Sequence, residues 1–276
     1  MKIDSHNHFW NFDAARHSWI DDSMKVIQRD FMPEEFNFIL QKNGFDGTVV
    51  VQVDQTPKEN TFLLQLAEVN SKIKGVVGWV DLGADNLGEQ LEQLSGFEKL
   101  KGFRHIAQAE NNDFLAQNDI IRGVQRLNNY NFTYDILINP AQLDAAIQLV
   151  SSCPDQRFVL DHIAKPYLKT GEIEQWRNDI SKLSSFENVW CKVSGMVTEA
   201  NWNNWKVNDF FPYLDVVFEA FGSKRLMYGS DWPVCLLAAE YEQVVEIAES
   251  YIRNLSAIEQ AGFWGLNAID FYQLNK

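Results

Sequence analysis

Short apolar segments alternate with segments of helical periodicity along the whole chain. The short segments are rich in β-branched and aromatic residues. Some, such as Val49–Val51, are continuous apolar runs, as expected for strands that are buried on both faces. The pattern predicts eight strands, at Lys2–Asn7, Thr48–Asp54, Lys74–Leu82, Gly102–Gln108, Phe132–Asn139, Phe158–Ile163, Val189–Ser194 and Leu226–Gly229.

Between these strands, apolar residues recur every three or four positions, which predicts amphipathic helices. The first helix begins at Pro33, a residue type favoured in the first helical turn, and stops at Gly44. The other predicted helices are Glu59–Asn70, Leu87–Leu94, Asp119–Leu127, Ala141–Val150, Glu172–Leu183, Pro212–Phe221 and Tyr241–Ile252.

Strict alternation of strands and helices predicts a parallel sheet, and eight such units in a chain of this length are typical of a (β/α)8 TIM barrel. A doubly wound sheet is less consistent with the sequence, because no G-x-G-x-x-G motif follows the first strand. No linker-like segment divides the chain, so we expect one α/β domain over residues 1–276. Two long aromatic-rich connections, Trp10–Met32 and Met196–Asp209, are expected to be functional loops.

Composition narrows the classes of partner. With 24 basic and 38 acidic residues the net charge is −14, which disfavours nucleic acids and anionic membranes and leaves a small molecule as the expected ligand. No apolar run is long enough to span a membrane, and the polar N-terminus predicts no secretory signal. Cys153, Cys191 and Cys235 fit neither a disulfide framework nor a zinc motif, so we expect a cytoplasmic protein. Composition does not indicate the oligomeric state.

Candidate catalytic residues follow the predicted strands. In TIM barrels the active site lies at the carboxyl ends of the strands. His6 and His8 are two positions apart at the end of the first strand, so their imidazoles share one face, while His162 ends the sixth strand and Asp231 follows the eighth. Singly, each has a structural interpretation, such as a cap or a turn. Together, three imidazoles and a carboxylate are costly to bury unless they hold a cation or transfer protons.

These motifs resemble the amidohydrolase superfamily, and in particular its branch of L-fuconolactonases and L-rhamnonolactonases. The resemblance implies a (β/α)8 fold and lactone hydrolysis by His6, His8, His162 and Asp231. The matching stretches extend over the whole chain, at Ile3–Trp10, Arg29–Pro33, Gly102–His105, Leu160–Pro166, Cys191–Gly195, Val197–Trp202 and Arg225–Pro233.

One departure from the superfamily concerns the metal. Members with two metal ions place a bridging Lys or Glu on strand four and a histidine on strand five. Here strand four offers Arg104 and His105, and strand five has Tyr134 and Asp135. We therefore expect either no required cofactor, as in some lactonases of this branch, or a single loosely bound Zn²⁺. Its ligands would be His6, His8, His162 and Asp231.

Lactone hydrolysis needs an activated water and a stabiliser for the oxyanion that forms. Asp231 is the expected general base, and the oxyanion would be met by Zn²⁺ or by the histidines and Arg104. Few cations and many tryptophans near the mouth suit a neutral, polyhydroxylated ring, although the tryptophans equally suit a covering role. The candidate substrate-binding residues are Arg104, His105, Tyr134, Lys165, Lys192, Ser194, Trp10, Trp19, Trp202 and Trp232.

The predicted function is hydrolysis of a neutral sugar lactone such as L-fucono-1,5-lactone. Three alternatives remain at this point. A decarboxylase of the same superfamily would need a firmly bound metal and a carboxylate pocket. A hydrolase for a dicarboxylate lactone is opposed by the scarcity of arginines at the mouth. A non-catalytic sugar-binding barrel is opposed by the histidines and aspartates at the strand ends.

Overall fold

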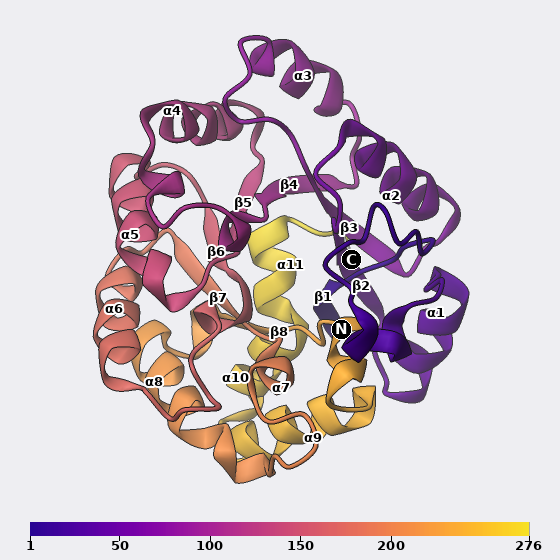
Figure 1. Ribbon diagram of the computed structural model, residues 1–276, viewed down its shortest axis with the longest axis vertical. Helices are drawn as coiled ribbons and strands as arrows, with labels where there is room; N and C mark the ends of the chain where they lie inside the picture. Colours follow the sequence, from indigo (N-terminus) through magenta and orange to yellow (C-terminus); the bar gives the residue numbers. More distant parts are fainter. Residues whose placement is uncertain (276) are drawn as a thin grey trace.

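The computed structural model describes residues 1–275, and its eight parallel strands follow one another in chain order around a barrel (Figure 1). The barrel closes just beyond the last strand, where Asn7 and Trp232 form a parallel bridge. This confirms the predicted (β/α)8 fold. The strands are β1 (Ile3–Asn7), β2 (Gly47–Val51), β3 (Ile73–Gly78), β4 (Leu100–His105), β5 (Thr133–Ile136), β6 (Phe158–Leu160), β7 (Val189–Val193) and β8 (Leu226–Tyr228).

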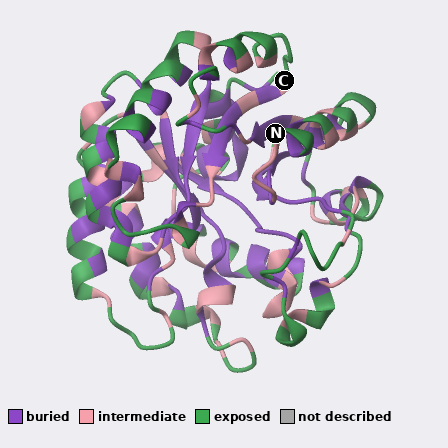
Figure 2. Ribbon diagram, turned by 45° about the horizontal axis from the view of Figure 1, so that its top comes forward, coloured by how far each residue is buried: buried purple, intermediate pink, exposed green. Residues whose placement is uncertain are grey.

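The helices form an outer ring with their buried faces toward the strands and their exposed faces outward (Figure 2). All eight predicted helices are present, with ends that differ by a few residues. They are α1 (Pro33–Lys42), α2 (Pro57–Val69), α3 (Leu87–Leu94), α4 (Asn118–Leu127), α5 (Leu143–Ser152), α6 (Glu174–Ser184), α8 (Phe211–Phe221) and α9 (Tyr241–Ile252). A single turn, α7 (Met196–Glu199), lies in the long connection after β7. No helix among residues 1–275 is long and apolar enough to cross a membrane.

Several strands end earlier than the apolar pattern predicts. β2 ends at Val51 and β3 at Gly78, whereas the sequence extends these strands to Asp54 and Leu82. The apolar residues beyond the strand ends, such as Val53 and Leu82, are still buried in the core. These apolar residues therefore indicate which positions are buried, but they do not indicate where the pairing between strands ends.

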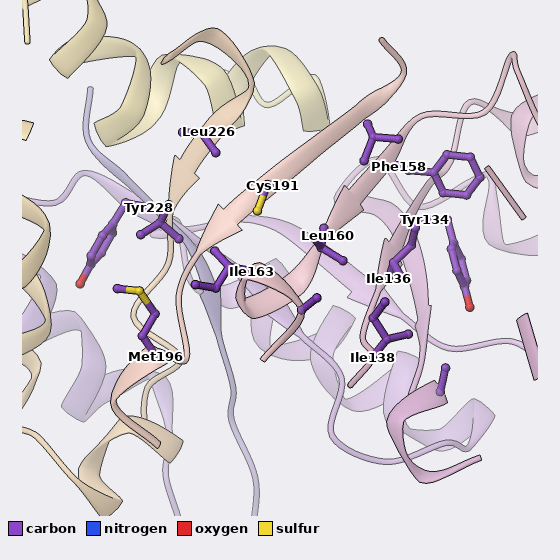
Figure 3. Close-up of a cluster of buried hydrophobic side chains, with 14 of the residues drawn as sticks. Tyr134, Ile136, Ile138, Phe158, Leu160, Ile163, Cys191, Met196, Leu226 and Tyr228 are labelled. Carbon is purple, nitrogen blue, oxygen red and sulfur yellow. The ribbon is translucent and has the colours of Figure 1, made fainter. Parts of the chain in front are cut away.

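The core has an outer layer between strands and helices and an inner layer inside the barrel. In the outer layer, Leu160, Cys191 and Leu226 occupy paired positions on β6, β7 and β8 (Figure 3). The inner layer contains Val49 and Met227. Buried apolar surface contributes about 25 cal/mol per Å², so these two layers supply most of the stabilisation.

The C-terminal segment has no counterpart among the predicted elements. It forms α10 (Ala257–Ala261), a π-helical turn, and α11 (Asn267–Tyr272), which lies across the barrel (Figure 1). Arg157, just before β6, donates to the carbonyl of Phe271 over 2.9 Å, which places α11 at the amino ends of the strands. This helix therefore closes one end of the barrel, and the opposite end is left to the loops that follow the strands.

Candidate active site

His6, His8 and Asp231 converge because barrel closure brings β1 beside the end of β8. The backbone N–H of Asp231 donates to the carbonyl of His6 over 2.8 Å. His8 Nε2 lies 3.2 Å from both His6 Nε2 and Asp231 Oδ1, and His6 Nε2 lies 3.8 Å from the same carboxylate oxygen. All three side chains are buried, and their ligand atoms are close enough together to hold one metal ion.

The protonation of these groups suits a cation. His8 Nδ1 lies 2.7 Å from the carbonyl of Val51, which only accepts, so in the neutral tautomer Nδ1 carries the proton and Nε2 presents a lone pair. Burial lowers the pKa of His6 well below its ordinary value, so this imidazole is neutral. Burial alone would raise the pKa of Asp231, but His162 and His8 outweigh it and hold the pKa below its usual range. Lone pairs and an anionic oxygen therefore face one another across about 3 Å, an arrangement that a proton or a metal ion relieves.

His162 is presented by an unusual turn. The predicted strand Phe158–Ile163 is too long, because β6 ends at Leu160. After Asp161, four consecutive residues adopt left-handed backbone conformations, with φ of 53° at His162, 48° at Ile163, 58° at Ala164 and 49° at Lys165. Such conformations cost L-residues roughly 1–2 kcal/mol each, so the turn persists only if its surroundings hold it.

Two buried contacts hold this turn. Trp176 Nε1 on α6 donates to the carbonyl of Ile163 over 2.9 Å, and His162 Nδ1 lies 2.9 Å from Ser194 Oγ at the end of β7. Gly195 packs against the His162 ring so closely that a Cβ there would lie 2.4 Å from Nδ1. His162 Nε2 is thereby directed toward Asp231, with 3.8 Å between Nε2 and Oδ1.

A balanced group of charges lies beneath the histidines, inside the barrel. Asp161 receives Arg104 Nη1 at 3.1 Å and Lys192 Nζ at 3.0 Å, and Lys192 Nζ is also 2.5 Å from Asp135 Oδ2. Burial would raise the pKa of Asp161, but Lys192 and His6 hold it well below its ordinary value. The negative charge of Asp161 is therefore already balanced by Arg104 and Lys192. For this reason the group of His6, His8 and Asp231 is the better metal site, and the second possible group, which consists of His6, Asp161 and His162, is less favourable.

Above these residues the loops enclose a cavity of about 470 Å³, which is within the range of small-molecule sites. Trp19 and Trp202 form part of its wall, and Lys165 Nζ pairs with Glu199 Oε1 at 3.3 Å on its rim. The lining includes His8, Trp19, Met24, Gln55, Arg104, Gln108, His162, Lys165, Thr198, Glu199, Trp202 and Asp231. Two larger grooves, of about 860 and 690 Å³, lie between outer elements and contain none of the clustered histidines.

Not all of the predicted site residues reach this cavity. His6, Lys192 and Ser194 lie directly beneath it through their contacts with one another and with His162, but they do not line it. Tyr134 and His105 are one position away from Asp135 and Arg104, so they point to the outer face of the barrel, where Tyr134 packs on Phe158 and His105 faces Glu110.

Two of the expected tryptophans are also elsewhere. Trp232 stacks on Phe36 of α1 with 4.6 Å between ring centroids, and Trp10 donates Nε1 to the carbonyl of Arg29 over 2.9 Å. Both are buried, so they support the mouth loops from behind and are not placed to contact a ligand in the cavity.

Several lining residues were not predicted from the sequence. Gln55 and Gln108 follow β2 and β4, and their position just beyond a strand end was the available signal. Thr198 and Glu199 lie within the motif Val197–Trp202, but nothing in the sequence alone indicates that they face Lys165.

Comparisons with known proteins agree with this architecture. The amidohydrolase family matches residues 3–274. An L-fucono-1,5-lactonase of Burkholderia multivorans is 37% identical over 99% of this chain and 96% of its own length, and one of Burkholderia ambifaria is 31% identical over 100% and 97%. A crystal structure of an amidohydrolase from Burkholderia multivorans with bound Zn has a TM-score of 0.96 and 37% identity, with full coverage of both chains.

The packing of Gly195 against His162 yields a stability prediction. Gly195 has φ of +59°, and an added Cβ would overlap the imidazole. We expect Gly195→Ala to lower the free energy of unfolding by about 2 kcal/mol or more, from backbone strain and displacement of His162. Gly88→Ala is the matched control, because Gly88 lies in α3 with nothing within 4 Å of its Cβ position. It should be neutral or stabilising by up to about 1 kcal/mol. Urea unfolding of both variants checks this, and equal stabilities would contradict the described packing.

Proposed function

Because the chain belongs to the amidohydrolase family, we propose that it hydrolyses the ring ester of a neutral sugar lactone, L-fucono-1,5-lactone or a similar aldonolactone. The main observation in support of this proposal is how the charged side chains of the cavity wall are paired. Arg104 is committed to Asp161 and to the carbonyl of Gln52, and Lys165 is paired with Glu199. Among the lining residues only the Asp231 carboxylate lacks a cationic partner, which suits an uncharged ester. The similarity to the two Burkholderia lactonases supports the same conclusion.

Asp231 is the proposed general base. Its low pKa keeps it ionised near neutral pH, and its carboxylate lines the cavity. A water molecule loses a proton to Asp231 while its oxygen bonds to the ester carbonyl carbon. Collapse of the tetrahedral intermediate breaks the bond between this carbon and the ring oxygen. The ring oxygen takes the proton that Asp231 received from the water, and the product is an open-chain hydroxy acid.

His162 and Lys165 are the proposed donors to the oxyanion. If the Ser194 hydroxyl donates to His162 Nδ1, the imidazole carries its proton on Nε2, the atom that faces Asp231. Lys165, from the same left-handed turn, adds an N–H donor, because its ion pair with Glu199 balances its charge but uses only one of its three protons. Both donors are fixed in direction before the substrate binds, which is the condition for effective oxyanion stabilisation.

His6, His8 and Asp231 fit a single divalent cation. When bound, such an ion supplies Lewis-acid polarisation of the ester carbonyl. Arg104 Nη1 lies 3.2 Å from His6 Nε2, and Lys192 Nζ lies 3.1 Å from His6 Nδ1. Two fixed positive charges beside one ligand oppose a divalent cation, so we propose that zinc is held weakly at this site.

The alternative functions are less consistent with this cavity. A dicarboxylate lactone or an aromatic acid requires a free cationic clamp for its carboxylates, and both cationic side chains of the lining already have anionic partners. A sugar-binding barrel without catalysis would have no need for buried imidazoles around a carboxylate, which are costly to desolvate.

The first test is a substrate panel. Sugar lactones, with L-fucono-1,5-lactone first, are offered to the protein beside a dicarboxylated pyrone, and proton release in weak buffer is followed. We expect hydrolysis of the neutral lactones and none of the pyrone. Preference for the pyrone would overturn the argument from paired cations, and no turnover of any lactone would exclude the proposed activity.

A second prediction concerns the base. Asp231→Asn is nearly isosteric and should lower kcat for the lactone by roughly 10²–10⁴-fold while the protein remains folded. Asp215→Asn on α8 removes an exposed carboxylate and serves as the control, with activity unchanged. Turnover close to the wild-type rate in a folded Asp231→Asn variant would mean that another group, with His162 the first candidate, takes the proton.

A third prediction concerns the metal. Because Arg104 and Lys192 lie beside His6, purified protein should contain zinc well below one ion per chain. Activity should largely survive chelation, since Asp231 and the fixed donors act on an ester without the ion. Metal analysis and lactone hydrolysis are measured on the same samples before and after chelation. One tightly held zinc per chain, with activity lost on removal and restored by zinc, would show that the site requires the ion.

A further inference from the structure

The cavity lining contains one arginine and one lysine, and their negative partners differ in kind. Arg104 pairs with Asp161, which has no exposed surface and also receives Lys192. Among residues 1–275, the one ion pair of Lys165 is with Glu199, which itself lines the cavity. The two side chains of this pair are 20% and 28% exposed. The charge of Arg104 is therefore balanced inside the fold, whereas that of Lys165 depends on a single side chain of the cavity wall.

The backbone holds both members of this pair in place. Lys165 ends the left-handed turn, and its N–H donates to the carbonyl of His162 over 2.8 Å. Glu199 ends α7, and the Thr198 carbonyl in the same turn accepts a hydrogen bond from Trp202 Nε1 over 2.8 Å. Because both segments are fixed, Lys165 is neutralised by Glu199 before any ligand enters the cavity.

The pair offers hydrogen bonds without net charge. Lys165 Nζ has three protons and donates one of them to Glu199 Oε1, and within residues 1–275 neither charged group makes another hydrogen bond. The remaining N–H groups and Oε2 are left for hydroxyl groups, which both donate and accept. A ligand carboxylate only accepts, and at Lys165 it would also lie beside the negative charge of Glu199. The wall therefore favours a polyol over an anion.

We propose that Glu199 is a specificity-determining residue, which excludes anionic ligands from the cavity by neutralising Lys165. Without the charge of Glu199, the Lys165 ammonium would form a binding site for a carboxylate. The cavity would then bind lactones that carry a carboxylate and would retain the acid product. The kinetic part of this inference rests on the proposed lactone hydrolysis, and the preference for uncharged ligands does not.

Glu199→Gln tests the proposal, because it keeps the shape of the side chain and one acceptor oxygen but removes the charge. A double variant with Lys165→Gln removes the ammonium as well, and it is used for binding alone. Glu242→Gln is the matched control. Glu242 on α9 pairs with Lys42 on α1 over 2.6 Å and does not line the cavity, so this variant loses one charge from the same kind of pair elsewhere.

The probes are L-fuconate and L-fucitol, which carry the same hydroxyl groups along the chain and differ at one terminal carbon, a carboxylate in the first and CH2OH in the second. Calorimetry measures their binding to chelator-treated protein, so that no metal ion attracts the carboxylate. We expect wild type and Glu242→Gln to show no preference for L-fuconate. Glu199→Gln should bind L-fuconate roughly tenfold more tightly than L-fucitol, less so at high salt, and the double variant should lose this gain.

Kinetics on L-fucono-1,5-lactone provide the second measurement, with L-fuconate, its hydrolysis product, as the inhibitor. In Glu199→Gln the inhibition constant of L-fuconate should fall roughly tenfold, in line with the binding. KM for the neutral lactone should rise only a few-fold, since one acceptor oxygen remains. A merely structural role of Glu199 would impair both ligands alike and would not strengthen the binding of the acid.

Each outcome decides the proposal. If Glu199→Gln binds L-fuconate no more tightly than wild type does, undetectable binding included, Glu199 does not exclude anions. A gain that persists in the double variant, or that appears equally in Glu242→Gln, would also overturn the proposal, because Lys165 would not be its cause. If the wild-type protein hydrolyses no lactone, the proposed function fails, and calorimetry alone decides the role of Glu199.

Discussion

Two carboxylates, Asp135 and Asp161, are fully buried inside the barrel, and the site above them depends on how their charge is balanced. Removing such ions from water costs several kcal/mol each unless cations accompany them. Arg104 and Lys192 meet this requirement with contacts of 2.5–3.1 Å. Each of these four charged residues comes from a different strand or strand end. Their charges can therefore balance one another only when the strands have assembled into the barrel. The same contacts fix His6 and leave Asp231, one layer higher, as the carboxylate that faces the cavity.

The fold supports this charged group and the histidines above it from both ends of the barrel. From below, α11 closes the barrel and reaches Asp135 through Tyr272. From above, the left-handed turn His162–Lys165 presents an imidazole and an ammonium group, at a conformational cost of several kcal/mol in total. Trp176 and Ser194 offset that cost with buried hydrogen bonds. Strain of this kind is typical of functional sites, where the position of a side chain matters more than local stability.

Periodicity was sufficient to predict the barrel, because strands buried on both faces and amphipathic helices leave distinct patterns in the sequence. The same period-two rule placed His6 and His8 together. Applied to neighbouring residues, it also implies that Tyr134 and His105 face away from Asp135 and Arg104, as the structure has them.

The remaining features depend on contacts between distant segments. No glycine marks the left-handed turn at His162–Lys165, so the local sequence gives no indication of it. The contact between Tyr272 and Asp135 spans 137 residues and follows only from the path of the C-terminal helix. Trp10 and Trp232 lie beside catalytic candidates in sequence, but the chain turns their rings into the layer behind the mouth.

Charge pairing in the cavity also bears on how the proposed reaction ends. The substrate is neutral, and hydrolysis creates a carboxylate next to Asp231, whose charge no cation of the lining neutralises. Two like charges about 4 Å apart repel by about 4 kcal/mol at the effective dielectric constant of a partly buried site. Lys165 does not cancel this repulsion, because Glu199 lies 3.3 Å from its ammonium. The site that binds the ester is therefore unfavourable for the acid, and the arrangement that selects a neutral substrate also promotes release of the product.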